Sequence, residues 1–220
     1  MSSTSTHQSR GIDLERLILM PLFVLLLILN GAAMWSLRGD SLDRTGWLGA
    51  AHGTVITGFY ALLVGLLLFR APSKATTRSS GAVVAAYVGT FAPFLLVLQS
   101  RVGASERLLL LSTTVMLFGL GITLYGLVWL GRSFGVVPAG RNLVTSGPYR
   151  WVRHPLYAGE FVTFFGAVLV GLSPFTVTLL VAWISVQVYR ALQEEKLLTQ
   201  VFPEYGAYMA KTARFVPGLL

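Results

Sequence analysis

Residues 141–160 read RNLVTSGPYRWVRHPLYAGE and stand between two long apolar runs of the chain. The stretch gathers arginines, a histidine and two tyrosines, whereas a plain connector between helices is usually shorter and less polar. Pro155 suits the first turn of a helix because it lacks the amide hydrogen that would stay unpaired there. It also biases His154 toward an extended backbone. The stretch therefore predicts a helix that begins at Pro155, with polar side chains collected just before it.

The composition of the whole chain is that of an integral membrane protein. Of its 220 residues, 54% are hydrophobic and 12% are charged, with a mean hydropathy of +0.68, whereas an average soluble domain has about 25% charged residues. Cysteine is absent, which excludes disulfides, a thiolate nucleophile and a cysteine metal site. The net charge is +8, but the basic residues stand singly at the ends of apolar runs. Membrane topology explains that pattern, and we expect no nucleic-acid partner.

Four uncharged runs precede the polar stretch, at residues 17–37, 45–69, 79–100 and 108–131. Each is long enough to cross a hydrocarbon core of about 30 Å as a helix that rises about 1.5 Å per residue. Residues 1–130 are therefore predicted to form a polar N-terminal segment and four transmembrane helices. A cleaved signal peptide is the second interpretation of the first run. We interpret His52, in the second run, as a side chain that bonds a neighbouring helix or interfacial water rather than as a functional ligand.

After the polar stretch, residues 161–189 are again uncharged but are interrupted by Ser173 and Pro174. The run is too long for one span, and the interruption predicts a tight helical hairpin. The tail that follows shows helical periodicity, which predicts amphipathic cytosolic helices. Residues 131–220 are thus predicted to form a second region with a loop, the hairpin and the tail, and the polar residues gathered in it make it the candidate catalytic region. The fold class is all-α, a polytopic membrane protein of about six transmembrane segments.

The distribution of basic residues predicts the orientation in the membrane. With a cytosolic N-terminus, thirteen of the seventeen lysines and arginines fall on the cytosolic side, which satisfies the positive-inside rule. The N- and C-termini are then both cytosolic, at the inner membrane if the cell is bacterial. The same orientation brings residues 141–160 and the tail to one face, where they can form one site.

Arg190 and Glu194 stand four residues apart in the tail and share one face of its predicted helix. An exposed ion pair is the plain interpretation, but arginine before glutamate is the weaker order for helix stabilisation. Both are therefore candidate catalytic residues, with the plain ion pair as the alternative.

Three ordered blocks resemble one enzyme family. They are LVTSGPY and RHPLYAG between residues 143 and 159, RALQEE at residues 190–195, and FPEYGAY at residues 202–208 followed by Arg214 and Pro217. In this order and spacing they resemble the isoprenylcysteine carboxyl methyltransferase family and its bacterial relatives, which are also similar to phospholipid N-methyltransferases. The resemblance covers about residues 130–217, and the first three predicted spans lie outside it.

The resemblance implies an S-adenosylmethionine-dependent methyltransferase without a metal. Its acceptor would be lipophilic and enter from the bilayer; the carboxylate of a prenylcysteine or of a similar small lipid is favoured. Arg190 would hold this acceptor, and Glu194 would bind the cofactor. The other residues implied to line the cofactor all belong to the polar stretch: Arg141, Asn142, Leu143, Val144, Tyr149, His154, Pro155, Leu156 and Tyr157. Arg141 departs from the eukaryotic pattern, which has a histidine there.

Two other functions stay open. Membrane sterol reductases share the HPxY block and use NADPH, but they usually carry an arginine and aspartate pair where this chain has Glu194 and Glu195. The second alternative is a membrane scaffold without catalysis. The intact set of His154, Arg190 and Glu194 argues against it.

Overall fold

The computed structural model describes residues 14–36, 44–93, 95 and 105–218. Its helices, short 3₁₀ turns (η) and strands are, in chain order, α1 (Leu14–Ser36), α2 (Arg44–Phe69), β1 (Ala75–Thr76), α3 (Ser80–Phe91), α4 (Glu106–Leu130), η3 (Gly131–Ser133), β2 (Ala139–Gly140), η4 (Gly147–Arg150), α5 (Pro155–Leu169), α6 (Pro174–Val201) and α7 (Tyr205–Met209). In this described part the two strands form a single antiparallel pair. The chain is mostly helical, as its apolar runs predict.

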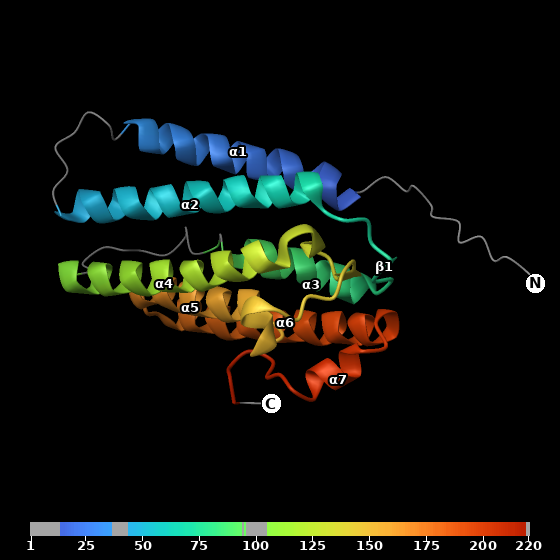
Figure 1. Cartoon of the computed structure of the whole chain (residues 1–220). Helices are drawn as coiled ribbons and strands as arrows, with labels where there is room; N and C mark the ends of the chain where they lie inside the picture. The colour runs from blue at the N-terminus through green and yellow to red at the C-terminus, as the bar shows by residue number, and fades with distance from the viewer. Residues whose placement is uncertain (1–13, 37–43, 94, 96–104, 219–220) are drawn as a thin grey trace, which may run out of the picture.

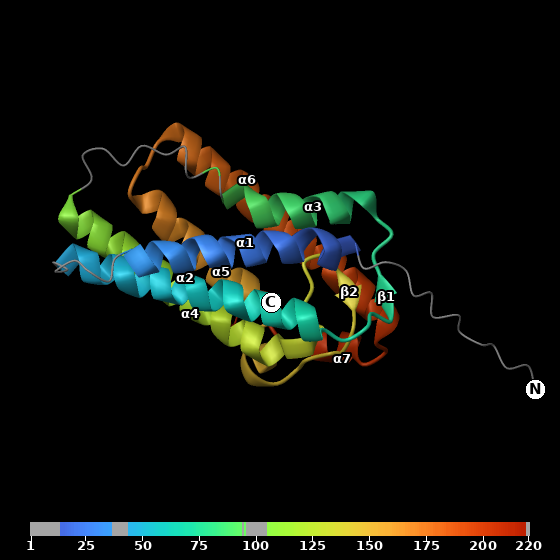
Figure 2. The ribbon, with the colours of Figure 1, turned by 90° about the horizontal axis from the view of Figure 1, so that it is seen from above.

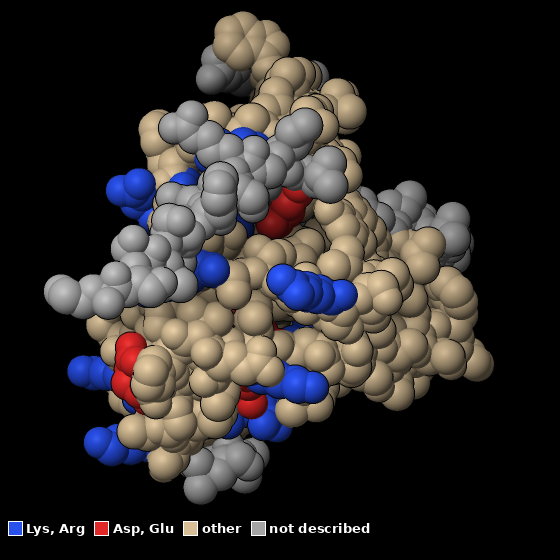
Figure 3. Space-filling model, turned by 90° about the vertical axis from the view of Figure 1, so that its right-hand side faces the viewer, with Lys and Arg blue, Asp and Glu red and all other residues tan. Residues whose placement is uncertain are grey.

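Helices α1 to α6 run alternately in opposite directions (Figures 1 and 2). One end of the bundle, called the polar end below, is built from residues 70–79, 131–154 and 202–218. The β1–β2 pair and α7 lie there, beside the end of α6 (Figure 2). Figure 3 faces this end, where lysine and arginine side chains are spread over the surface. The polar stretch and the tail thus lie at the same end of the bundle.

Helices α4 and α5 approach each other closely because glycines stand at their contact. A methyl group added to Gly119 would lie 2.4 Å from the backbone nitrogen of Thr163, and one added to Gly159 would lie 2.6 Å from that of Thr123. The absence of side chains at Gly119 and Gly159 therefore allows the close packing of α4 on α5. This packing fixes the start of α5 relative to α4.

Within the described residues, three helices are long and apolar enough to cross a membrane, at Glu15–Trp35, Glu106–Ser133 and Pro174–Val201. Shorter apolar helices cover Ile56–Phe69, Ser80–Phe91 and Pro155–Leu169. Large apolar side chains such as those of Leu17, Phe118 and Val181 are exposed on the outside of the bundle. Such a surface suits lipid rather than water, and the chain is an integral membrane protein.

The third predicted span is shorter as a helix than its uncharged run. Helix α3 ends at Phe91, two residues before Pro93, because a proline has no amide hydrogen for the helical ladder and its ring crowds the preceding turn. Most of the rest of that run, residue 94 and residues 96–100, lies outside the described residues. The side chain of His52 does so too.

The break predicted at Ser173 and Pro174 is confirmed. Helix α6 begins at Pro174, and Ser173 caps its first turn with both a side-chain and a backbone hydrogen bond. The tail differs from the prediction, since residues 190–201 extend α6 and do not form a separate helix. The reason is that no proline interrupts the helix before Pro203. Only α7 is a separate helix of the tail.

Candidate functional site

The start of α5 presents a stacked pair of rings. Pro155 is the first residue of the helix, as the sequence predicts, and His154 precedes it with φ of −127°. The rings of His154 and Tyr157 are nearly parallel, with centroids 5.3 Å apart and an interplanar angle of 9°. Both side chains are buried. One turn of helix therefore fixes an imidazole and a phenol beside each other.

The C-terminal segment is held against the polar stretch by backbone hydrogen bonds. Val152 and Ala213 form a parallel bridge. The amide of Arg153 donates to the carbonyl of Ala213 (2.8 Å), and the amide of His154 donates to the carbonyl of Arg214 (3.0 Å). The tail and the residues just before α5 therefore fold as one unit.

Glu195 of α6 joins this unit to the bundle. Its buried carboxylate accepts from Nε of Arg153 (2.7 Å) and pairs with Nη2 of Arg214 (2.9 Å). Nε2 of His154 lies 3.2 Å from the same carboxylate. The hydrogen bond to Glu195 raises the pKa of Arg214. One carboxylate thus orients His154 and fastens the tail.

Glu194, the neighbouring residue, faces a different partner. Its carboxylate accepts a hydrogen bond from the hydroxyl of Tyr157 (3.2 Å) and lies 3.9 Å from Nδ1 of His154. The side chain of Glu194 is 33% exposed, whereas that of Glu195 is 7% exposed. Only Glu194 therefore keeps carboxylate oxygens open to a ligand, and its charge suits a cationic group.

Arg190 lies one helical turn before Glu194, also against Tyr157. Its guanidinium carbon is 5.1 Å from the centroid of the Tyr157 ring. Nη1 donates to Oε1 of Gln187 (2.6 Å), and Nη2 donates to the carbonyl of Val136 (3.1 Å). The buried Nε has no hydrogen-bond partner among the described residues. A buried donor without a hydrogen bond costs about 1–3 kcal/mol of stability. This N–H is therefore the donor of Arg190 that is best placed to bond an oxygen of a ligand.

The Arg190 side chain is held from several helices. Gln187, which accepts from Arg190, in turn donates to the carboxylate of Glu160 in α5. Gly89 of α3 lies directly against the guanidinium, since an added methyl group there would lie 2.8 Å from Nη1 of Arg190. Nε1 of Trp183 donates to the carbonyl of Gly89 (2.7 Å) and keeps α3 in place. The guanidinium thus has one fixed orientation.

The structure brings four predicted site residues into contact, namely His154, Tyr157, Arg190 and Glu194, as their distances above show. Tyr149 lies near them in the interior, where burial, followed by the negative charge of Glu194, raises its pKa well above the usual value.

Arg141, another predicted site residue, contacts α1 and the segment that follows α2. Its Nη2 lies 3.9 Å from the carboxylate of Glu15 in α1, and its Nε donates to the carbonyl of Ala71 (3.1 Å). These contacts join the polar stretch to α1 and to the segment that follows α2. The three residues that follow range from exposed to partly buried: Asn142, Leu143 and Val144.

Pro155 and Leu156 face α4. A methyl group added to Gly126 would lie 2.8 Å from Cδ1 of Leu156, 3.4 Å from its backbone nitrogen and 3.6 Å from Cγ of Pro155. The first turn of α5 therefore packs on α4 through these two residues.

Sequence reasoning assigned no site role to three residues that the structure brings together: Glu195, Arg153 and Arg214. All three stand in the blocks that carry the resemblance, but none was named as a site residue. Consecutive residues on a helix point about 100° apart, which is the signal that Glu195 and Glu194 have different partners.

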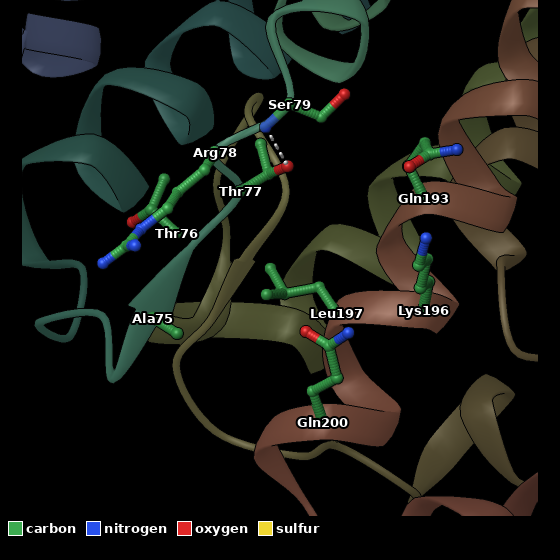
Figure 4. A pocket seen from close by; sticks show the side chains of 9 residues that line it. All are labelled: Ala75, Thr76, Thr77, Arg78, Ser79, Gln193, Lys196, Leu197 and Gln200. Carbon is green, nitrogen blue, oxygen red and sulfur yellow. Dashed lines mark hydrogen bonds between the residues drawn. The ribbon is translucent and has the colours of Figure 1, made fainter.

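Two further observations concern ligand binding at the polar end. A cleft of about 410 Å³ opens between residues 75–79 and the side of α6 that carries Gln193, Lys196, Leu197 and Gln200 (Figure 4). No predicted site residue lines it. Among the residues that the structure describes, no group of three His, Asp or Glu side chains is placed to hold a metal ion.

Comparison with known proteins places this geometry in context. Residues 108–205 match the phospholipid methyltransferase family. The nickel-cobalt-cadmium resistance protein NccN of Alcaligenes xylosoxydans xylosoxydans is 34% identical over 115 residues, which are 48% of this chain and 50% of that protein. The cobalt-zinc-cadmium resistance protein CzcN of Cupriavidus metallidurans is 32% identical over 115 residues, 48% of this chain and 49% of that protein. The chain spans about half the length of these curated relatives.

Among solved structures, the chain is similar to the eukaryotic intramembrane Ras methyltransferase, an isoprenylcysteine carboxyl methyltransferase. The TM-score is 0.55 at 19% sequence identity, and the likeness covers 90% of this chain and 74% of that one. At this identity the comparison shows a shared fold. It extends to the first helices, which the family match does not reach.

Proposed function

We propose that the chain is an S-adenosylmethionine-dependent methyltransferase acting on a lipophilic acceptor, starting from the match of residues 108–205 to the phospholipid methyltransferase family. The observation that carries the proposal is the arrangement around Tyr157. This one side chain contacts a partly exposed carboxylate, Glu194, and a fixed guanidinium with a free buried donor, Arg190. A cationic donor and an anionic acceptor need such a pair of opposite charges close together.

The residues present fit S-adenosylmethionine. The cofactor carries a sulfonium and an ammonium, and Glu194 offers a carboxylate with exposed oxygens beside the stacked rings of His154 and Tyr157. When bound, the cofactor supplies a methyl group that is open to in-line displacement and needs no covalent enzyme intermediate. Glu194 would hold the cationic end of the cofactor, and the hydrogen bond from Tyr157 would keep that carboxylate in place.

The acceptor is proposed to be a lipophilic carboxylate, such as that of a prenylcysteine or a similar small lipid, which enters from the bilayer. The free Nε of Arg190 supports an anionic acceptor. Its N–H can donate to an acceptor oxygen while the two Nη atoms keep their bonds to Gln187 and Val136. A carboxylate is already deprotonated at neutral pH, so no general base is needed. His154, whose Nε2 contacts Glu195, then acts as a hydrogen-bonding wall of the site.

The proposal is tested by ligand binding to the detergent-solubilised protein. We expect S-adenosylhomocysteine to raise its thermal midpoint and NADPH to leave it unchanged, because a ligand that binds only the folded state stabilises it by about 2.7 kcal/mol at a hundredfold excess over Kd. Stabilisation by NADPH alone would favour a sterol-reductase-like enzyme. A midpoint that neither ligand moves would favour a scaffold without catalysis.

We further propose six membrane crossings with both termini in the cytosol, which puts the polar end on the cytosolic side. The alternating direction of α1 to α6 (Figure 1) and the basic residues of the polar end (Figure 3) support this orientation. Reporter tags after Arg78, at Asn142 and after Leu220 should all report the cytosolic side, and one near Ser41 the opposite side. A tag after Leu220 that reports the outside would contradict the proposal.

A further inference from the structure

We propose that Glu15, in the first turn of α1, is a positioning residue that sets the orientation of Arg190 through the backbone of Val136. The inference rests on the proposed function, in which Arg190 holds the acceptor. It gives α1, which lies outside residues 108–205, a defined part in the site.

Val136 is the residue through which Glu15 and Arg190 are connected. Its amide donates to Oε1 of Glu15, and its carbonyl accepts from Nη2 of Arg190. Both bonds are buried, and Val136 itself is 7% exposed. The N–H and the C=O belong to the two peptide planes that meet at the Cα of Val136, so the bond to Glu15 holds one plane and leaves the other only its own dihedral freedom. Glu15 therefore restricts where the carbonyl that accepts from Arg190 can lie.

The carboxylate of Glu15 is itself held in place. Its Oε2 lies 3.1 Å from Nη1 of Arg70 and 3.9 Å from Nη2 of Arg141. A methyl group added to Gly135 would lie 2.4 Å from Nη1 of Arg141. A glycine at this position therefore leaves the room that the guanidinium of Arg141 occupies beside the loop. The two oxygens thus have separate tasks, since Oε2 binds the arginines and Oε1 binds the loop.

The outcome for Arg190 is a guanidinium fixed at two points. Gln187 holds Nη1 and Val136 holds Nη2, which leaves Nε as a buried donor without a partner in the part of the chain that the structure describes. If the Val136 carbonyl moves, Nη2 is released and the guanidinium can rotate about its last bonds. Acceptor binding should suffer, whereas cofactor binding at Glu194 should not.

Two substitutions at Glu15 separate its two tasks. Glu15→Asp keeps the charge that faces the arginines but is one methylene shorter, so its carboxylate withdraws from the Val136 amide. Glu15→Gln keeps the length and a carbonyl oxygen for that amide but loses the charge. Arg16→Gln is the matched control: Arg16 is adjacent in α1 and donates to the carbonyls of Leu67 and Leu68 (both 2.9 Å), not to the loop.

The experiment combines hydrogen exchange of residues 134–137 with kinetics in detergent. The acceptor probe is N-acetyl-S-farnesyl-L-cysteine, a lipophilic carboxylate, with methyl-labelled S-adenosylmethionine. In Glu15→Asp we expect exchange to speed up about tenfold through the lost hydrogen bond, and the KM for the acceptor to rise at least about fivefold. The affinity for S-adenosylhomocysteine should stay within about twofold. Glu15→Gln and Arg16→Gln should lower the thermal midpoint while exchange and acceptor KM stay near the wild-type values.

The reverse order, with Glu15→Gln changing exchange and KM more than Glu15→Asp, would overturn the proposal, because Glu15 would then serve only its ion pairs. Equal changes in all three variants would overturn it too. Exchange does not depend on turnover, so it decides the link from Glu15 to the loop even if the wild type transfers no methyl group to the probe. That last result would count against the carboxylate acceptor of the proposed function alone.

Discussion

The substitution Glu194→Gln should weaken binding of S-adenosylhomocysteine by roughly 1.5–3 kcal/mol, about ten- to a hundredfold in Kd. Glutamine keeps the shape of the side chain and its bond to Tyr157. It removes the negative charge that would face the ammonium of the ligand, so a charge-assisted hydrogen bond becomes a neutral one. Titration calorimetry on the purified protein measures the change directly.

Arg190→Lys is the matched comparison one helical turn away. Lysine keeps the positive charge but loses the planar fork that is fixed by Gln187 and Val136. It should impair use of the acceptor while the affinity for S-adenosylhomocysteine stays nearly intact. Unchanged affinity in both variants would remove Glu194 from the cofactor site. A loss confined to Arg190→Lys would reverse the two assigned roles.

The substitution Glu195→Gln should destabilise the protein by about 3–5 kcal/mol, because it removes the counter-charge of a buried arginine. Arg153 is 9% exposed and bonds this carboxylate at 2.7 Å, and Arg214 and His154 share it. The thermal midpoint in detergent should fall by many degrees. It is measured from the loss of the tertiary-structure signal on heating.

Glu194→Gln serves as the control in the same assay. Its carboxylate is one third exposed and accepts one hydrogen bond, from Tyr157, so its loss should cost under about 1 kcal/mol of stability. Equal shifts for the two neighbouring glutamates would contradict the structural role of Glu195.

Local backbone chemistry is the part of this molecule that its sequence predicts well. Pro155 and Pro174 mark the starts of α5 and α6, because proline fits the first helical turn and Ser173 supplies a cap there. The common face of Arg190 and Glu194 also follows from helical spacing alone.

The partners of the charged side chains were not predictable in the same way. Arg153 stands in a basic, turn-rich segment and looks like any cytosolic arginine, yet it is buried because the tail folds back over it. Glu15 belongs to a segment without a recognisable motif, and only the fold brings it to Val136. Contacts between residues more than forty positions apart leave no recognisable pattern in the sequence around either residue.

The bridge between Val152 and Ala213 determines when the site can form during synthesis. In the proposed arrangement of six crossings, α1 to α6 are synthesised in chain order and residues 212–214 follow all of them. Until the tail has folded back, Arg153 and His154 lack the backbone partners that it provides. The site therefore becomes competent to bind a ligand only once the tail is in place, after the helices that precede it have been inserted.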